Sequence, residues 1–233
     1  MKASDRLIVA LDVPGPDDAR DLISKIGAHA GVWKIGLELL FSGGADLARE
    51  LADAGQRVFV DAKLLDIPNT VERATENIAA MGATFLTVHG HDVKTMKAAM
   101  RGREGSDLKL LAVTVLTSLD QADLEEQGSR MSPAELVLHR AQLRKEAGFD
   151  GVIASGKEAA QIREATGSDF LIVTPGIRPA GADVGDQARV MTPARAIAAG
   201  ADYLVVGRPI TQADDPAAAA AAIAGEIESA LSA

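Results

Sequence analysis

Two carboxylates and one ammonium follow an apolar run in the segment VFVDAKLLDIPNTV, residues 58–71. Residues i and i+2 of a strand point to the same side, so we expect Asp61 and Lys63 to face each other at ion-pairing distance. Pro68 disfavours helix before it and suits a first helical turn, which would hold Asp66 just beyond the strand. Carboxylates beside an ammonium can hold and move a proton, and such a group is costly as a structural device alone. The pattern favours a functional site, with a structural salt-bridge cluster as the alternative.

A second group of polar residues lies near the C-terminus and suits a phosphate. Gly207 and Arg208 follow the apolar run YLVV, and a guanidinium can bind phosphate through two hydrogen bonds. Before them, the glycine-containing segment 176–192 carries Arg178 and Gln187. Long loops of this kind can act as lids over a bound anion. We expect a phosphate-binding end built from these residues; a plain surface loop is the alternative for the segment.

These residues need a scaffold that brings distant segments together, and the rest of the chain predicts one. Short runs rich in β-branched residues alternate with segments of helical spacing. The expected strands are Arg6–Leu11, Val32–Gly36, Arg57–Val60, Thr84–Val88, Lys109–Thr117, Gly151–Ala154, Phe170–Val173 and Tyr203–Val206. The alanine-rich tail has Ile223, Ile227 and Leu231 at intervals of four. This spacing predicts a last helix that packs by one face.

Strands that alternate with helices pair in parallel, and eight such units in a chain of this length favour a (β/α)8 barrel. An open, doubly wound sheet is the alternative, although ALDVPGPDDA does not match its usual G-x-G-x-x-G turn. Active sites of barrels lie at the C-terminal ends of the strands. The residues at these expected ends are polar or charged, apart from one glycine: Asp12, Lys34, Asp61, Lys63, His89, Thr117, Ser155, Arg178, Gly207 and Arg208.

Composition narrows the class of protein further. The 233 residues include no cysteine, which excludes disulfides, thiolate metal sites and a cysteine nucleophile. The net charge of −9 argues against a nucleic-acid partner. No run reaches transmembrane length, so we expect a cytoplasmic protein without a membrane partner, built as a single barrel domain over residues 1–233. His89 and His91 form a His-x-His pair, but no third ligand supports a metal site there.

The segment DAKLLDIPNT resembles the D-x-K-x-x-D-I-P-x-T signature of orotidine 5′-monophosphate decarboxylases. ALDVP, KIGLEL, TVLTS, TPGIRP and VGRPI resemble further elements of that family in the same order, from Arg6 to Ile210. The resemblance implies a homodimer of (β/α)8 barrels that converts orotidine monophosphate to uridine monophosphate and CO2, without a metal or organic cofactor. One departure is HGHDVKTM, which stands where bacterial members often have H-A-x-G-G.

The resemblance also implies a role for each matching residue. Lys63 is expected to be the general acid, and Asp61 to lie beside the substrate carboxylate. Asp66 and Thr70 are expected to reach into the site of the neighbouring subunit. The other expected substrate contacts are Asp12 and Lys34 at the ribose, Thr117 at the pyrimidine, and Arg178, Gln187, Gly207 and Arg208 at the phosphate.

The implied reaction explains why an ammonium is needed. Loss of CO2 from C6 of the pyrimidine leaves an electron pair that the ring delocalises poorly, and a fixed ammonium at Lys63 can stabilise this charge and deliver a proton. Two alternatives remain. A Mg²⁺-dependent sugar-phosphate enzyme on the same barrel, such as a ketogulonate-phosphate decarboxylase or hexulose-phosphate synthase, is disfavoured by the I-P-x-T continuation and TPGIRP. A non-catalytic nucleotide-phosphate sensor is disfavoured because Asp61, Lys63 and Asp66 are all present.

Overall fold

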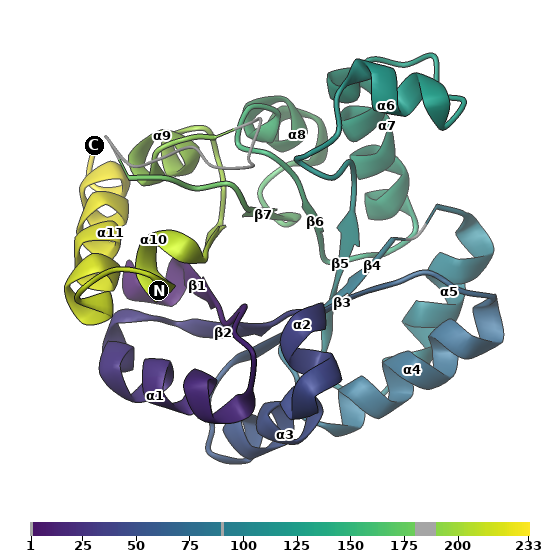
Figure 1. Ribbon diagram of the computed structural model, residues 1–233. Helices are drawn as coiled ribbons and strands as arrows, with labels where there is room; N and C mark the ends of the chain where they lie inside the picture. The colour runs from purple at the N-terminus through teal and green to yellow at the C-terminus, as the bar shows by residue number, and fades with distance from the viewer. Residues whose placement is uncertain (1, 90, 180–189) are drawn as a thin grey trace.

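The eight expected strands form a closed parallel barrel in the computed structural model, which describes residues 2–89, 91–179 and 190–233 (Figure 1). Each strand pairs with the next in chain order, and β1 closes the ring against β8. The strands are β1 (Leu7–Ala10), β2 (Val32–Ile35), β3 (Val58–Leu64), β4 (Phe85–Val88), β5 (Lys109–Val113), β6 (Gly151–Ile153), β7 (Leu171–Thr174) and β8 (Tyr203–Val206). The closed ring confirms the barrel and rules out the open sheet.

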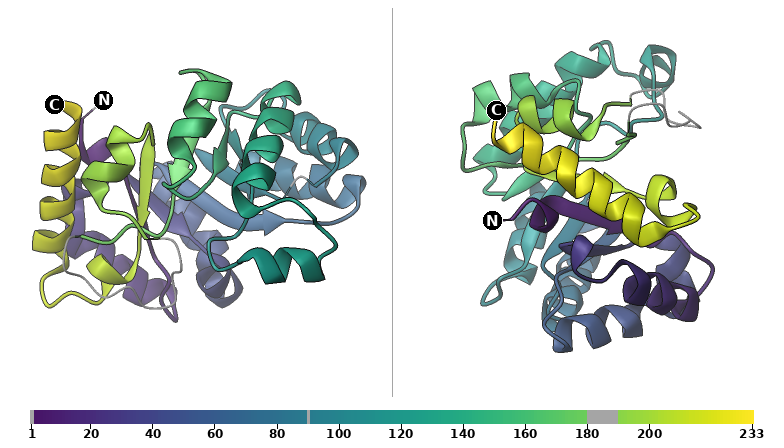
Figure 2. Two further views of the ribbon diagram at one scale, coloured as in Figure 1. Left: turned by 90° about the horizontal axis from the view of Figure 1, so that it is seen from above. Right: turned by 90° about the vertical axis from the view of Figure 1, so that its left-hand side faces the viewer.

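Helices surround this ring, as the two further views in Figure 2 also show, and the short helices α2 and α10 contribute residues to the cavity described below. They are α1 (Pro16–Ile26), α2 (Leu37–Leu39), α3 (Ala45–Asp53), α4 (Pro68–Ala80), α5 (Val93–Gly102), α6 (Gln121–Glu126), α7 (Pro133–Glu146), α8 (Ala159–Thr166), α9 (Pro193–Ala198), α10 (Arg208–Thr211) and α11 (Pro216–Leu231). Short 3₁₀ segments, η1 (Ser4–Arg6) and η2 (Gly27–His29), precede β1 and β2, and a π-helical turn, η3 (Leu40–Gly44), joins α2 to α3. Within the described ranges, no helix combines the length and apolar character needed to cross a bilayer.

The helix starts follow from local chemistry. Proline begins α4, α7 and α11, where its missing N–H is not needed and its fixed φ suits the first turn. The last helix packs as expected at Ile223 and Ile227, which are buried, whereas Leu231 is 45% exposed because the helix ends there. The one-face prediction for α11 is therefore right for its first two positions and wrong for the third.

Apolar side chains fill the barrel below its mouth. The interior cluster comprises Ile8, Val32, Phe59, Phe85, Leu111, Val173 and Tyr203. Phe85 makes edge-to-face contacts with both Phe59 and Tyr203, with ring centroids 6.0 and 5.3 Å apart. Because strand side chains alternate, the residues two positions later on β2, β3 and β4 share this side. They form the next layer toward the mouth: Lys34, Asp61 and Thr87.

Strand β3 departs from regular pairing where it reaches the mouth. Val60 lies opposite Leu86 and Leu64 lies opposite Val88, so three residues of β3 face the single residue Thr87 of β4. Within this bulge Lys63 has φ 46°, the one positive φ found outside glycine in the described part of the chain. The sequence predicts that this strand ends at Val60, but the bulge allows it to continue to Leu64. Bulges of this kind redirect side chains and are common beside active sites.

Candidate active site

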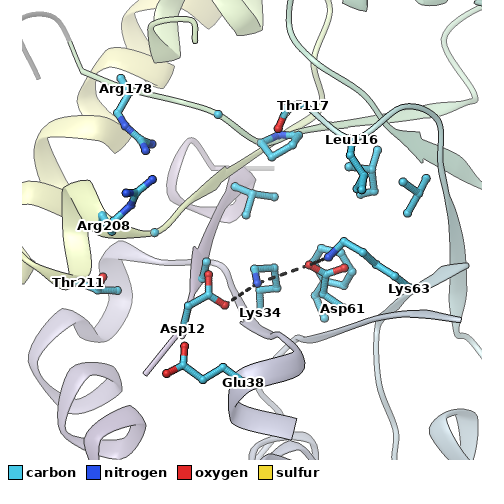
Figure 3. A pocket seen from close by; sticks show the side chains of 18 of the residues that line it. Asp12, Lys34, Glu38, Asp61, Lys63, Leu116, Thr117, Arg178, Arg208 and Thr211 are labelled. Atoms are coloured by element: carbon cyan, nitrogen blue, oxygen red, sulfur yellow. Dashed lines mark hydrogen bonds and ion pairs between the residues drawn. The ribbon is translucent and has the colours of Figure 1, made fainter. Parts of the chain in front are cut away.

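A cavity of about 500 Å³ opens at the C-terminal ends of the strands (Figure 3). It is the place where sequence reasoning puts the site. Eight of the eleven residues proposed from sequence line it: Asp12, Lys34, Asp61, Lys63, Thr117, Arg178, Gly207 and Arg208. They come from segments spread between residues 12 and 208, and the closed ring brings them together.

Four of these side chains form a row of alternating charge across β1, β2 and β3. The ammonium of Lys34 lies 2.9 Å from a carboxylate oxygen of Asp12 and 3.5 Å from one of Asp61. The ammonium of Lys63 lies 2.9 Å from the same oxygen of Asp61. Lys34 and Asp61 are only 6% and 8% exposed. The row therefore holds two positive charges against two negative ones, with its centre shielded from water.

Asp61 is ionised because of its neighbours. Burial alone would raise the pKa of its carboxyl, but the positive charges of Lys34 and Lys63, with hydrogen bonds from Lys63 and Thr87, hold this pKa below its usual value. A carboxylate that remains ionised keeps both ammonium groups in place.

Gly36 makes the contact between Asp12 and Lys34 possible. A side chain at this position would place its Cβ 2.7 Å from a carboxylate oxygen of Asp12 and 2.8 Å from the ammonium of Lys34. Both atoms belong to the charge row, so neither can move away without breaking it. The glycine directly after β2 is thus required by close approach of the two site residues.

The opposite end of the cavity carries two guanidiniums. Arg178 follows β7 and Arg208 follows β8, and both side chains enter the cavity from the side away from Lys63 (Figure 3). The Arg178 guanidinium donates to the carbonyl of Ile177 at 2.9 Å, which helps to fix its position. Two guanidiniums at one end of a cavity can bind a phosphate with charge-assisted hydrogen bonds.

Several lining residues are not among those proposed from sequence. They include Glu38 of α2, Leu116 after β5, and Thr211 and Gln212 at the end of α10. Each lies in a short segment just after a strand, so the barrel rule could have identified the segment but not the side chain that faces the cavity. Glu38 and Leu116 lie within KIGLEL and TVLTS, but these motifs do not show which of their side chains face the cavity.

Two of the proposed residues do not line the cavity of their own chain. Asp66 and Thr70 are exposed beyond the end of β3 and at the start of α4. The carboxylate of Asp66 accepts a hydrogen bond from the backbone N–H of Ile67 at 2.6 Å. Leu65 and Ile67, on either side of Asp66, are 57% and 67% exposed. The remaining proposed residue, Gln187, lies outside the described residues.

The His-x-His pair after β4 makes contact but does not form a recognisable metal site. The rings of His89 and His91 meet edge to face with centroids 5.2 Å apart. Burial, with the nearby positive charges of His91, Lys63 and Arg140, lowers the pKa of His89 to about 4. In the ranges that the structure covers, no three His, Cys, Asp or Glu side chains gather at metal-binding distance.

The unusual loop HGHDVKTM has one clear structural function. Asp92 is the N-cap of α5, and its carboxylate accepts hydrogen bonds from the backbone N–H and the hydroxyl of Thr95, at 2.9 and 2.8 Å. Both bonds satisfy groups at the start of the helix. Asp92 thus starts the helix that follows β4.

Comparisons with known proteins agree with this architecture. A model of the orotidine 5′-phosphate decarboxylase / HUMPS family matches residues 5–223. A protein of Bradyrhizobium sp. named orotidine 5′-phosphate decarboxylase is 57% identical over 227 residues, which are 97% of this chain and 93% of the relative. One of the same name from Methylorubrum extorquens is 54% identical over 226 residues, 97% of each chain. The crystal structure of orotidine 5′-phosphate decarboxylase from Lactobacillus acidophilus superposes with a TM-score of 0.84 at 41% identity, covering 95% of this chain and 98% of that one.

Proposed function

Because the chain belongs to the orotidine 5′-phosphate decarboxylase / HUMPS family, we propose that it converts orotidine 5′-monophosphate to uridine 5′-monophosphate and CO2. This reaction is the last step of de novo pyrimidine synthesis, and the proposal includes a cytoplasmic location. One observation carries the proposal. The cavity has the Asp61–Lys63 ion pair at one end and the guanidiniums of Arg178 and Arg208 at the other. A nucleotide monophosphate has its base and its phosphate at opposite ends, which matches this distribution of charge.

In the proposed complex, each part of the substrate meets a different set of side chains. The phosphate binds Arg178 and Arg208, together with the backbone at Gly207 and the side chain of Gln187. The ribose hydroxyls bind Asp12 and Lys34, whose ion pair places a carboxylate and an ammonium side by side. The pyrimidine lies beside Thr117, which lines the cavity.

The proposed chemical step needs no electron sink. The bond between C6 and the carboxylate carbon breaks, CO2 leaves, and the electron pair of the bond stays at C6. The ammonium of Lys63 stabilises this charge and donates its proton to C6, after which the neutral amine takes a proton from water. Lys63 suits this role because it is held in the cavity by Asp61 while 30% of its side chain remains accessible.

Asp61 has two roles in the proposal. Its ionised carboxylate accepts a hydrogen bond from the ammonium of Lys63 at 2.9 Å and so orients it. Its negative charge also lies beside the substrate carboxylate, and this repulsion is relieved when CO2 leaves. The second role needs Asp61 to be buried and ionised at once, which the ion pairs with Lys34 and Lys63 support.

The active form in the proposal is a homodimer in which sites are completed across the interface. Asp66 and Thr70 lie outside the cavity of their own chain, so they are available to a partner. Exposed Leu65 and Ile67 on either side of Asp66 supply apolar surface of the kind that a subunit interface covers. In this arrangement each site takes Asp61 and Lys63 from one chain and Asp66 from the other.

The test is to mix purified protein with orotidine 5′-monophosphate in the presence of EDTA and to follow the loss of pyrimidine absorbance. We expect turnover without added metal. A Mg²⁺-dependent sugar-phosphate enzyme would instead lose its activity in EDTA and would leave the nucleotide unchanged. A non-catalytic sensor would bind uridine 5′-monophosphate but show no turnover of the substrate, and either result would overturn the proposal.

A further inference from the structure

One buried hydroxyl connects the two ends of the β3 bulge without lining the cavity. Thr87 lies on β4 with no exposed surface, and its side chain is on the same face of the strand as Phe85, toward the barrel interior. It is the residue that faces the bulge, since its neighbours Leu86 and Val88 pair with Val60 and Leu64. A threonine in a β-strand is ordinary, so its sequence position alone gives no reason to consider it.

The hydroxyl of Thr87 makes two hydrogen bonds, and both go to residues of the charge row. It donates to one carboxylate oxygen of Asp61 at 2.8 Å and accepts from the backbone N–H of Lys63 at 3.0 Å. The other oxygen of Asp61 accepts from the ammonium of Lys63 at 2.9 Å. The three residues therefore form a closed loop: hydroxyl to carboxylate, carboxylate to ammonium, and backbone amide back to hydroxyl.

The hydrogen bond from the Lys63 N–H to Thr87 replaces a backbone hydrogen bond that the bulge removes from the strand pairing. In a regular ladder the backbone N–H groups of a strand find carbonyl partners on the neighbouring strand, and a bulge leaves some of them without one. Here the side chain of Thr87 takes the place of that carbonyl. Regular pairing resumes one residue later, where the N–H of His89 donates to the carbonyl of Leu64 at 2.9 Å. The same hydroxyl thus supports the left-handed backbone of Lys63, which a lysine rarely adopts unaided.

We propose that Thr87 is a positioning residue for the decarboxylation put forward above: its hydroxyl holds the backbone of Lys63 and the carboxylate of Asp61 in one fixed arrangement. The inference rests on the proposed function, because it assigns Thr87 to the same site. Thr87 does not line the cavity, so it acts on the substrate through Lys63 and Asp61. Without the hydroxyl, the bulge loses its bridge and the ammonium loses its fixed direction toward C6.

The matched pair of variants is Thr87→Val and Thr87→Ser. Valine keeps the shape and the β-branched character but removes the hydroxyl, whereas serine keeps the hydroxyl and removes one methyl group. We expect the valine variant to lower kcat by roughly 10- to 100-fold, the size of effect seen when a catalytic group is displaced by a small distance. Its KM and its affinity for uridine 5′-monophosphate should stay near those of the unchanged protein, since Arg178 and Arg208 are not affected. The serine variant should keep a kcat near the original.

A purely structural role for Thr87 gives a different result. In that case both variants would have a lower melting temperature than the unchanged protein, because each lacks one group of the buried side chain. The kcat of the folded fraction would be unchanged in each variant. An unchanged kcat in folded Thr87→Val, or an equal loss in Thr87→Ser, would overturn the proposal. If the valine variant does not fold, Thr87→Ala replaces it in the same comparison.

A second measurement separates this proposal from the proposed function. Hydrogen–deuterium exchange resolved at the Lys63 amide needs no turnover. We expect protection of this amide in the unchanged protein and in Thr87→Ser, and faster exchange in Thr87→Val. If the protein does not decarboxylate the nucleotide but shows this exchange pattern, the proposed function is wrong and the positioning of Lys63 by Thr87 is still supported. Equal protection in all three proteins would show that Thr87 does not hold Lys63, whatever the activity.

Discussion

The ammonium of Lys63 lies 2.9 Å from a carboxylate oxygen of Asp61, although the backbone between them leaves regular strand geometry. The pair is therefore formed by a bulge that redirects the lysine. Its position is set by contacts within the protein: the ion pair with Asp61 and the hydrogen bond from the Lys63 N–H to Thr87. Changes at this pair should then act mainly on the chemical step, while changes at the far end of the cavity should act on binding.

Replacement of Lys63 tests the general-acid role. Lys63→Ala should lower kcat by about 10²–10⁴-fold, the usual contribution of a general acid. Binding of uridine 5′-monophosphate, measured by calorimetry, should persist because the guanidiniums remain. Lys97→Ala is the matched control, since Lys97 is exposed on α5 away from the cavity. Near-normal turnover of Lys63→Ala would remove Lys63 from the mechanism.

Mixed dimers test the shared site. Lys63→Ala and Asp66→Ala homodimers should both be severely impaired, because every site in each lacks one group. After subunit exchange, one site of each mixed dimer takes Lys63 from the Asp66→Ala chain and Asp66 from the Lys63→Ala chain, and is complete. With random pairing, about one quarter of all sites should then be active.

The readout is turnover before and after exchange, with mixed dimers identified by native mass spectrometry. Mixed dimers that are present but show no recovered activity would contradict the shared-site model. They would place the function of Asp66 within its own chain.

The apolar residues beside Asp66 provide an independent test of the interface. Leu65→Ser combined with Ile67→Ser should shift the protein toward monomer in analytical ultracentrifugation, because both side chains are more than half exposed in the isolated chain. The specific activity of this double variant should fall on dilution, because its dimers separate into monomers. Leu231→Ser, at a leucine of α11 that is 45% exposed, is the control and should change neither property. A double variant that stays dimeric at all concentrations would place the interface elsewhere.

Arg208 tests the phosphate end. A hydrogen bond to a charged group contributes about 1.5–3 kcal/mol, so Arg208→Ala should raise the Kd for uridine 5′-monophosphate by about 10- to 150-fold. The Kd for uridine, which lacks the phosphate, should not change. Arg195→Ala, at an exposed arginine of α9, is the control. Equal losses for nucleotide and nucleoside would show that Arg208 does not act through the phosphate.

His89 predicts a pH dependence of stability. Its pKa is about 4 in the folded protein, below the ordinary 6.5, because burial and nearby positive charges disfavour the charged form. Between these two values the unfolded chain binds more protons at His89 than the folded protein does, so the free energy of unfolding falls as the pH falls. After discounting for its partial exposure, we expect the residue to contribute about 1–2 kcal/mol to this loss.

Urea unfolding at about pH 7 and about pH 4.5 measures this contribution. The loss of stability between the two pH values should be smaller in His89→Gln than in the unchanged protein. His139→Gln, at an exposed histidine of α7, should lose as much as the unchanged protein. An identical loss in His89→Gln would mean that His89 does not titrate in this range.

The fold could be predicted from the sequence because its signals are local and repeated. Every expected strand overlaps a strand of the barrel, since β-branched runs between helical segments have one dominant solution as parallel units. Boundaries were harder to predict. Lys109–Thr117 is apolar enough to be predicted as one strand, but β5 ends at Val113, and the residues that follow line the cavity. The extension of β3 to Leu64 depends on a bulge held by another strand, and periodicity does not encode that contact.

The site could be predicted only where residue types are unusual for their position. Charged residues at the ends of apolar strands, such as Lys34 and Asp61, are conspicuous and do line the cavity. Thr87 is not conspicuous, because a threonine is common in strands and its contacts with Asp61 and Lys63 depend on tertiary structure. Glu38 and Thr211 could not be predicted for a related reason: polar residues that follow a strand are common on protein surfaces, so their type does not indicate that they line the cavity.

The burial of Lys34 and Asp61 lowers the stability of the barrel that contains the site. Two charges removed from water cost the fold free energy that apolar side chains of similar size would not, and buried pairs of this kind can often be replaced with a gain in stability. A population of variants selected for heat resistance alone would therefore tend to lose this pair and fill the barrel mouth with leucine or methionine. Selection for turnover opposes this loss, so the charged pair at the barrel mouth is retained for activity and not for stability.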